Sequence, residues 1–220
     1  MLAHPAAASQ AARPRRIWKC LPHYPNVILR RRRLPHLDVL GQPLFVTFRL
    51  HRSLPPNRPF PASNLTSGQA FVTMDRLLDQ ARCGPPFLRQ PGIAQLVLAS
   101  MEYGVEIGHY QLHSWVIMPN HVHLLLTPHV GASKLLGSLK TATAKPANLL
   151  LRRAGQPFWQ GESYDHLVRN EDEFRRIRWY IENNPVTAGL AARPEEYPWS
   201  SAGRPGRPPQ AVGLPHRESQ

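Results

Sequence analysis

The chain has 220 residues, of which 42% are hydrophobic, so it is long enough for one ordinary domain and apolar enough to bury a core. This composition excludes a wholly disordered or fibrous protein. With 27 Lys and Arg against 14 Asp and Glu, the net charge is +13, which favours nucleic acid as the partner.

The sequence also argues against several other kinds of protein. Two cysteines, Cys20 and Cys83, are too few for a disulfide scaffold, and neither has the spacing of a zinc site. No apolar run approaches the roughly 18 residues that a membrane helix needs. The first 16 residues lack the long apolar stretch of a secretory signal. We therefore expect a soluble cytoplasmic protein with no membrane partner.

Positive charge and proline are concentrated at the two ends of the chain. The first 60 residues hold 11 Lys and Arg but a single acidic residue, Asp38. Ten of the 24 prolines lie in residues 1–61 and six in residues 194–220. Because proline opposes helix interiors and central strands, these ends are expected to lie outside the folded body. The prediction is a basic N-terminal arm (1–39), a folded domain (40–192) and a proline-rich tail (193–220).

Hydrophobic periodicity predicts eight elements in the body. Strands are expected at 43–52, 109–118, 121–127 and 158–168, and helices at 67–82, 91–103, 131–153 and 171–184. Pro119-Asn120 predicts a turn that joins the middle strands into a hairpin, Pro146 predicts a kink or interruption in the third helix, and Pro185 predicts that the last helix ends at Asn184. The order predicts an α+β sandwich, an antiparallel sheet with helices packed on one face.

Two histidines alternate with an apolar residue in the second hairpin strand. His121 and His123 are two positions apart, so both project from the same face of the strand. Two imidazoles at that separation can chelate one divalent ion. Spacing alone favours the alternative, two polar residues on the solvated face of a half-buried strand, and a metal site needs a third ligand.

The last predicted helix carries a tyrosine and an amide at helical spacing. Tyr180 and Asn184 are four residues apart and share one face of the helix. An amide oxygen can bind a hard cation, and a phenol can attack an electrophile that such a cation holds. The alternative is structural, with Asn184 as a helix-end cap and Tyr180 as a core residue.

Several basic residues are candidates for contacting DNA phosphates. These are Arg31, Arg32, Arg33, Arg49, Lys140 and Arg169. Each can also be an ordinary solvated side chain, and the run from Arg30 to Arg33 can be an arm without a specific contact. Trp159 can stack on a base or, as its surroundings favour, pack in the core.

Four segments taken together resemble a known family. They are the hairpin segment WVIMPNHVHLLL (115–126), the aromatic segment PFWQGESYDH (157–166), the helix segment YIENNPVTAGL (180–190) and YPWSS (197–201). In this order they are similar to the single-tyrosine HUH transposases, and among these to the REP-associated tyrosine transposases. HUH stands for two histidines that flank a hydrophobic residue.

This resemblance implies a ferredoxin-like fold of the HUH endonuclease type and a specific chemistry. It implies that His121, His123 and Asn184 bind Mg²⁺ or Mn²⁺ and that Tyr180 is the nucleophile. The implied enzyme is a metal-dependent single-stranded DNA endonuclease and strand transferase that forms a 5′-phosphotyrosine intermediate at hairpin or repeat DNA. It implies either a monomer or a homodimer in the bacterial cytoplasm, associated with the nucleoid when bound to DNA.

Two other functions remain open on the sequence. The first is a DNA-binding protein of the same ancestry that recognises repeat hairpins without cutting them. The second is an RNA-binding ferredoxin-like domain, which relies on aromatic side chains of the sheet to stack bases. The four implied site residues favour the cutting enzyme over the pure binder.

Overall fold

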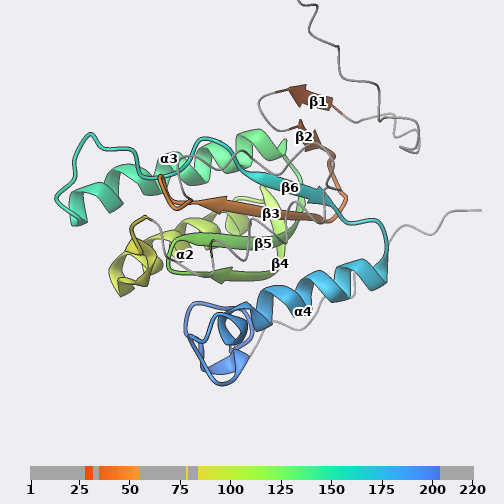
Figure 1. The fold of residues 1–220 in the computed structure, drawn as a ribbon. Coiled ribbons are helices and arrows are strands. Elements are labelled where there is room, and N and C mark those ends of the chain that lie inside the picture. Colours follow the sequence, from red (N-terminus) through yellow and green to blue (C-terminus); the bar gives the residue numbers. More distant parts are fainter. Residues whose placement is uncertain (1–27, 32–34, 55–77, 79–83, 204–220) are drawn as a thin grey trace, which may run out of the picture.

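The computed structural model describes residues 28–31, 35–54, 78 and 84–203, and a four-stranded antiparallel sheet forms its centre (Figure 1). The strands are β3 (Leu44–Arg49), β4 (Tyr110–Ile117), β5 (His121–Pro128) and β6 (Tyr164–Leu167), and their order across the sheet is β4-β5-β3-β6. β4 and β5 form the predicted hairpin. The α+β class with an antiparallel sheet is therefore confirmed.

Three helices complete the described part of the fold. They are α2 (Pro91–Glu106), α3 (Ala132–Leu150) and α4 (Glu171–Thr187). From β3 to β6 the described elements follow the order strand, helix, two strands, helix, strand, which is the ferredoxin-like arrangement. The helix expected at 67–82 lies outside the described residues apart from Leu78, which is helical and buried.

Both faces of the sheet carry apolar side chains. In the antiparallel register of β3 and β5, Val46 lies opposite Leu124 and Thr47 opposite His123. Because side chains alternate along a strand, Val46 and Leu124 face one side, where they pack in one core with α2 and α3. Phe45 and Leu125 face the other side and pack with Ile181 of α4.

The sequence pattern predicted that all helices pack on one face of the sheet. In the structure the helices divide between the two faces, with α2 and α3 on one and α4 on the other. α4 lies beside β4, apart from α2 and α3 (Figure 1). The apolar stripe of α4 includes Phe174 and Ile177, which pack in the cluster on the second face. A sheet with apolar residues on both faces must be covered on both, and the alternation within single strands does not show which helix covers which face.

Pro146 lies inside α3, which continues as one helix to Leu150. Proline has no backbone N–H, so the carbonyl of Ala142 lacks its usual donor four residues on. Thr143 and Ala147 on either side are buried, and Ala147 belongs to the main core. Packing of this buried face keeps the helix uninterrupted at the proline.

The prediction that the last helix ends at Asn184 is wrong, because α4 runs through Pro185 to Thr187. Pro185 removes one donor from the helix, but the next turn forms without it. The backbone N–H of Ala188 donates to the carbonyl of Asn184 at 2.9 Å, and that of Leu190 donates to the carbonyl of Pro185 at 2.8 Å. Pro185 and Asn184 are both buried, so tertiary packing outweighs the bias of the residue before a proline against helix.

Short segments flank the sheet on both sides of the predicted body. β1 (Ile28–Arg31) and β2 (Pro35–Asp38) form a two-stranded antiparallel sheet within the predicted arm. After a short turn of 3-10 helix (Pro194–Glu196), the backbone at 199–201 hydrogen-bonds to β4, with Ile117 N donating to Trp199 O at 2.8 Å. The domain boundaries at 39 and 192 stay predictions.

None of the helices in the described ranges combines the length and the apolar character needed to cross a bilayer.

Candidate active site

The two histidines of the HUH segment lie on β5, a central strand of the sheet. His121 and His123 are fully buried and project from the same face, as their spacing predicts. Their Nε2 atoms lie 3.0 Å apart and their ring centroids 4.6 Å apart. The two imidazoles thus direct the same nitrogen atom toward one place.

The opposite nitrogen of each imidazole is held by a neighbouring polar group. Nδ1 of His121 lies 2.6 Å from Oδ1 of Asn120, and Nδ1 of His123 lies 2.7 Å from Oγ1 of Thr47. Nδ2 of Asn120 donates to the carbonyl oxygen of Leu78 at 3.0 Å, which sets the orientation of the amide. Because Oδ1 can only accept, Nδ1 of His121 carries the proton and its Nε2 presents a lone pair.

The histidine pair fits a divalent cation. Two ligands about 2.1 Å from an ion and at right angles to each other are about 3.0 Å apart, which is the separation of the two Nε2 atoms. The hydroxyl of Thr47 can accept a proton from Nδ1 of His123, so that this ring also presents a lone pair at Nε2. Within the described ranges, no three His, Cys, Asp or Glu side chains cluster as a metal site would require.

Helix α4 brings Tyr180 and Asn184 to the same face of the sheet. The ring of Tyr180 packs edge-on against His123, with centroids 5.7 Å apart, and against Phe45 at 6.2 Å. Nδ2 of the buried Asn184 donates to the hydroxyl of Tyr180 at 3.1 Å, one helical turn away. The structure therefore gathers the histidine pair, the tyrosine and the amide on one side of the sheet.

Arg49 is the basic candidate that lies beside the histidines. It is directly opposite His121 in the antiparallel register, so both side chains project from the same face. Its Nη1 donates to Oγ of Ser53 at 3.2 Å, and burial lowers the pKa of its guanidinium below the usual value. A cation in this position can attract a phosphate toward the histidine pair.

Two other described tyrosines, Tyr110 and Tyr197, have different surroundings from Tyr180. The hydroxyl of Tyr110 donates to the carbonyl oxygen of Met101 at 2.7 Å, and burial raises its pKa to about 12. The hydroxyl of Tyr197 donates to the carbonyl oxygen of Ile117 at 3.0 Å, and burial raises its pKa to about 12 as well. A tyrosine that is both bonded to a backbone carbonyl and harder to ionise is a poor nucleophile.

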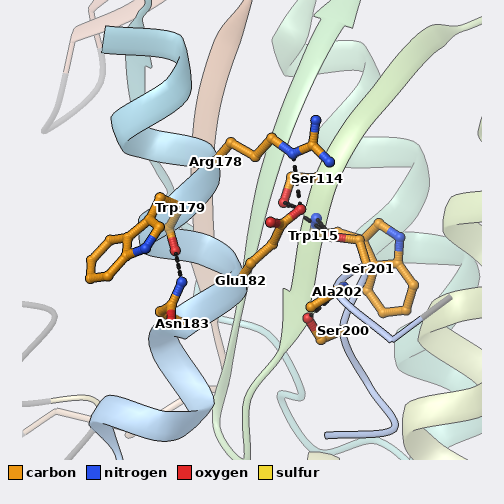
Figure 2. A network of polar contacts seen from close by, with 9 residues as sticks. All are labelled: Ser114, Trp115, Arg178, Trp179, Glu182, Asn183, Ser200, Ser201 and Ala202. Carbon is orange, nitrogen blue, oxygen red and sulfur yellow. Dashed lines mark hydrogen bonds and ion pairs between the residues drawn. The ribbon is translucent and has the colours of Figure 1, made fainter. Parts of the chain in front are cut away.

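A polar network fastens α4 to β4 (Figure 2). Oε1 of Glu182 accepts from Nε of Arg178 at 3.0 Å and from the buried hydroxyl of Ser114 at 3.5 Å. Ser114 also shares a hydrogen bond of 3.0 Å with Ser201, whose Oγ accepts from the backbone N–H of Trp115 at 3.1 Å. These contacts join the tyrosine helix, the edge strand and the segment at 199–201.

Two other basic candidates, Lys140 and Arg169, have different surroundings from Arg49. Nζ of Lys140 donates to the carbonyl oxygens of Gln160 and Gly161 at 2.9 and 3.0 Å, on the helix that covers the opposite face. Arg169 precedes α4, where its backbone N–H donates to Glu173. Arg31 closes β1, whereas Arg32 and Arg33 lie outside the described residues. Their role in DNA binding stays a prediction.

Sequence reasoning missed two residues of the site, Asn120 and Thr47. Asn120 was assigned only to the turn, although its position immediately before His121 was a signal that its amide could reach that ring. Thr47 had no local signal, because it faces His123 only through the register of two strands that are 76 residues apart in the chain. Trp159 is a core residue, as its surroundings favoured, and its Nε1 donates to the hydroxyl of Thr143 at 2.8 Å.

One sequence family matches a segment of this chain that contains most of the site residues. Residues 88–184 match the sequence family described as "Transposase IS200 like". This range includes both histidines and ends at Asn184, and it leaves β3 with Thr47 and Arg49 outside.

Two curated proteins are similar to parts of this chain. A REP-associated tyrosine transposase of Escherichia coli is 26% identical over 95 residues, which cover 42% of this chain and 54% of that protein. An uncharacterized protein of Haemophilus influenzae is 26% identical over 98 residues, which cover 34% of this chain and 54% of that protein. The chain thus spans about half the length of the curated relatives it matches.

Among solved structures, one of a REP-associated tyrosine transposase bound to a REP hairpin is 18% identical, with a TM-score of 0.49, over 87% of this chain and 96% of that chain. The family match and the curated relative together confirm the resemblance that the motifs indicate, namely to the REP-associated tyrosine transposases among the IS200-like transposases.

Proposed function

We propose that this protein is a metal-dependent single-stranded DNA endonuclease and strand transferase with Tyr180 as its nucleophile. One arrangement carries the proposal: the hydroxyl of Tyr180 is held by Asn184, and its ring packs against a histidine whose Nε2 is 3.0 Å from that of its partner. A nucleophile beside a chelating pair is the arrangement that phosphoryl transfer to a tyrosine needs.

His121 and His123 would hold a divalent cation, Mg²⁺ or Mn²⁺, through Nε2, and the amide oxygen of Asn184 is proposed as the third ligand atom. When bound, this ion supplies a Lewis acid for a non-bridging oxygen of the scissile phosphate. Asn120 and Thr47 hold the two rings by their Nδ1 atoms, which fixes the ring orientations before the ion arrives.

The residues of the chain provide the remaining steps. Arg49, beside His121, attracts the phosphate into the site. Oη of Tyr180 attacks phosphorus, so that a P–Oη bond forms and the P–O3′ bond breaks. The proton of Oη passes to solvent, and the departing oxygen takes up a proton and becomes a 3′-hydroxyl. Asn184 keeps the hydroxyl in place by donating to Oη.

The covalent intermediate accounts for strand transfer. A 5′-phosphotyrosine bond conserves the energy of the broken phosphodiester, so the 3′-hydroxyl of a second strand can reverse the step without ATP. We propose repeat or hairpin DNA as the substrate, and the Escherichia coli relative is described as REP-associated. The net charge of +13 agrees with a nucleic acid partner in the cytoplasm.

The test is a denaturing gel of the full chain with hairpin-bearing single-stranded DNA, with Mg²⁺ or Mn²⁺ and with chelator. The DNA carries a label at either its 5′ or its 3′ end. We expect a protease-sensitive adduct that needs metal, retains the 3′ label and releases the 5′ label on a fragment ending in a 3′-hydroxyl. Tyr180→Phe should form no adduct but bind DNA as before. Tyr103→Phe, an exposed tyrosine on α2, is the matched control.

Adduct formation by the Tyr180→Phe protein would show that the nucleophile is misassigned. Hairpin binding without any adduct in the unmodified protein would instead favour the alternative function, a DNA-binding protein of the same ancestry that does not cut.

A further inference from the structure

The outer surface of α4 carries an exposed tryptophan, Trp179, which immediately precedes the proposed nucleophile in the sequence. Trp179 is 66% exposed, although a large aromatic side chain usually buries most of its surface. Its side chain points away from β4, on the opposite side of the helix from Arg178 and Glu182 (Figure 2). The contacts that fasten α4 to the sheet therefore do not use this indole.

Arg176 lies on the same surface and connects Trp179 to Tyr180. It precedes Trp179 by three residues and Tyr180 by four, and side chains at both spacings are neighbours on a helix. Helical spacing thus places Arg176 between Trp179 and Tyr180 on the surface of α4. We refer to Arg176 and Trp179 as the outer patch of α4.

Among the described residues of α4, Arg176 does not take part in an ion pair. Arg175 pairs with Glu171 at 3.3 Å, and Arg178 pairs with Glu182 at 3.0 Å. For Arg176, an exposed residue, the described part of the structure contains no carboxylate partner. The exposed indole of Trp179 and the guanidinium of Arg176 thus lie on the turn of α4 that also carries Tyr180.

We propose that the outer patch of α4 binds the nucleotide next to the scissile phosphate, with the indole of Trp179 stacked on its base and Arg176 on its phosphate. This inference rests on the proposed function, since it assumes that single-stranded DNA reaches Tyr180. Stacking on an aromatic side chain together with a cation for the backbone is how proteins bind single strands without reading the sequence.

The chemistry of the patch fits nucleic acid better than a protein partner. One indole flanked by a cation is much smaller than the roughly 800 Å² that each side of a stable protein interface buries. The chain carries +13 overall, so a polyanion is the complementary occupant. A base that stacks here also extends the DNA along α4, which keeps the adjoining phosphate near the hydroxyl of Tyr180.

The experiment measures binding of a fluorescent single-stranded oligonucleotide by anisotropy, with chelator present so that no cleavage occurs. Trp179→Ala should weaken binding about 5- to 150-fold, the range expected for one lost base stack, and Trp179→Phe should weaken it about threefold or less. Arg176→Gln should lower the slope of log affinity against log salt by about 0.7. Tyr103→Ala removes an aromatic side chain of 59% exposure from α2 and should change neither quantity.

A scan with abasic nucleotides locates the contact. Replacing one nucleotide at a time should weaken binding of the unmodified protein at a position beside the cleaved phosphate, and the Trp179→Ala protein should be insensitive at that same position. This coupling separates stacking from a general loss of structure, which would weaken binding at every position. Circular dichroism and thermal unfolding of each variant check that α4 is intact.

The outcomes separate this inference from the proposed function. A metal-dependent adduct together with undiminished binding by Trp179→Ala would overturn the outer patch while the proposed function stands. Binding that depends on Trp179 at one nucleotide, with no adduct under any metal, would support the patch and reject cleavage. An unmodified protein that does not bind single-stranded DNA would overturn both.

Discussion

Oδ1 of Asn120 accepts a hydrogen bond of 2.6 Å from Nδ1 of His121, while Nδ2 of the same amide donates to the carbonyl oxygen of Leu78 at 3.0 Å. The amide is thus held at both ends, and it orients an imidazole that lies at the centre of the sheet. Asn120 is a positioning residue, because it acts on the proposed metal site only through His121.

Replacing Asn120 by Ala should weaken metal binding about 10- to 100-fold, since the ring of His121 loses the acceptor that sets its tautomer. Asn120→Asp keeps an acceptor oxygen and should restore most of the affinity. Calorimetric titration with Mn²⁺ measures the affinity, and adduct formation at saturating Mn²⁺ should recover in the Ala variant. Unchanged Mn²⁺ affinity in Asn120→Ala would show that the amide serves only the turn.

Thr47→Val replaces a hydroxyl by a methyl group of similar size and removes the partner of Nδ1 of His123. We expect half-maximal adduct formation to need about a tenfold higher Mn²⁺ concentration, because the ring of His123 is no longer held. DNA binding should change little, because Thr47 carries no charge. Thr47→Ser retains the hydroxyl and is the matched control. Equal Mn²⁺ dependence in the Val and Ser variants would contradict this role.

Ser201→Ala tests the network that fastens the tyrosine helix to the edge strand (Figure 2). The substitution leaves the backbone N–H of Trp115 and the buried hydroxyl of Ser114 without one partner, which costs about 1–2 kcal/mol of unfolding free energy. Urea unfolding measures this loss, and adduct formation should slow as α4 loosens.

Ser200→Ala is the control for this network, because the hydroxyl of Ser200 accepts only a local bond from Ala202 N at 3.2 Å. An adduct rate that falls equally in both serine variants would mean that the network does not position Tyr180.

Because His113 is partly buried, we expect the free energy of unfolding to fall in mild acid. Burial, and then the charge of Arg178, lower its pKa from 6.5 to about 4, and its Nε2 lies 2.7 Å from the hydroxyl of Thr127. The unfolded chain takes up a proton near pH 6.5, whereas the folded protein does so only near pH 4. The contribution of neutral His113 to the free energy of unfolding is therefore complete above pH 6.5, and it is lost as the pH falls toward 4.

His113→Gln should reduce the change in unfolding free energy between pH 7 and pH 5 by about 1 kcal/mol, a value lowered for the partial exposure of this group. Urea unfolding at the two pH values measures the difference. His129→Gln, on an exposed histidine that contacts the carbonyl oxygen of Gly108, should leave the difference unchanged. Identical pH profiles for the unmodified and His113→Gln proteins would reject the assignment.

Pro146→Ala should stabilise the protein by about 1–3 kcal/mol, because the new N–H can donate to the carbonyl of Ala142 within α3. Pro91→Ala, at the first position of α2, removes a proline whose missing N–H costs nothing and should change stability by less than about 0.5 kcal/mol. The midpoint of urea unfolding gives both values. A lower midpoint for Pro146→Ala would mean that the proline ring contributes needed packing.

Local patterns in the sequence were sufficient for much of the candidate site. An alternation of two predicts that His121 and His123 share a face, and a spacing of four predicts the same for Tyr180 and Asn184. The turn at Pro119-Asn120 predicts the central hairpin, and the structure confirms each of these relationships. They depend only on the geometry of one strand, one helix or one turn.

The tertiary structure decided which of these faces meet. The pairing of Thr47 with His123 and of Arg49 with His121 depends on the register of β3 against β5, which a one-residue slip would reverse. The packing of α4 on the second face depends on Ile181, which is buried with Phe45 and Leu125, and the helix continues through the buried Pro185. Periodicity shows that a face is apolar or polar, but contact between faces is selected by packing across distant parts of the chain, and no local pattern contains that information.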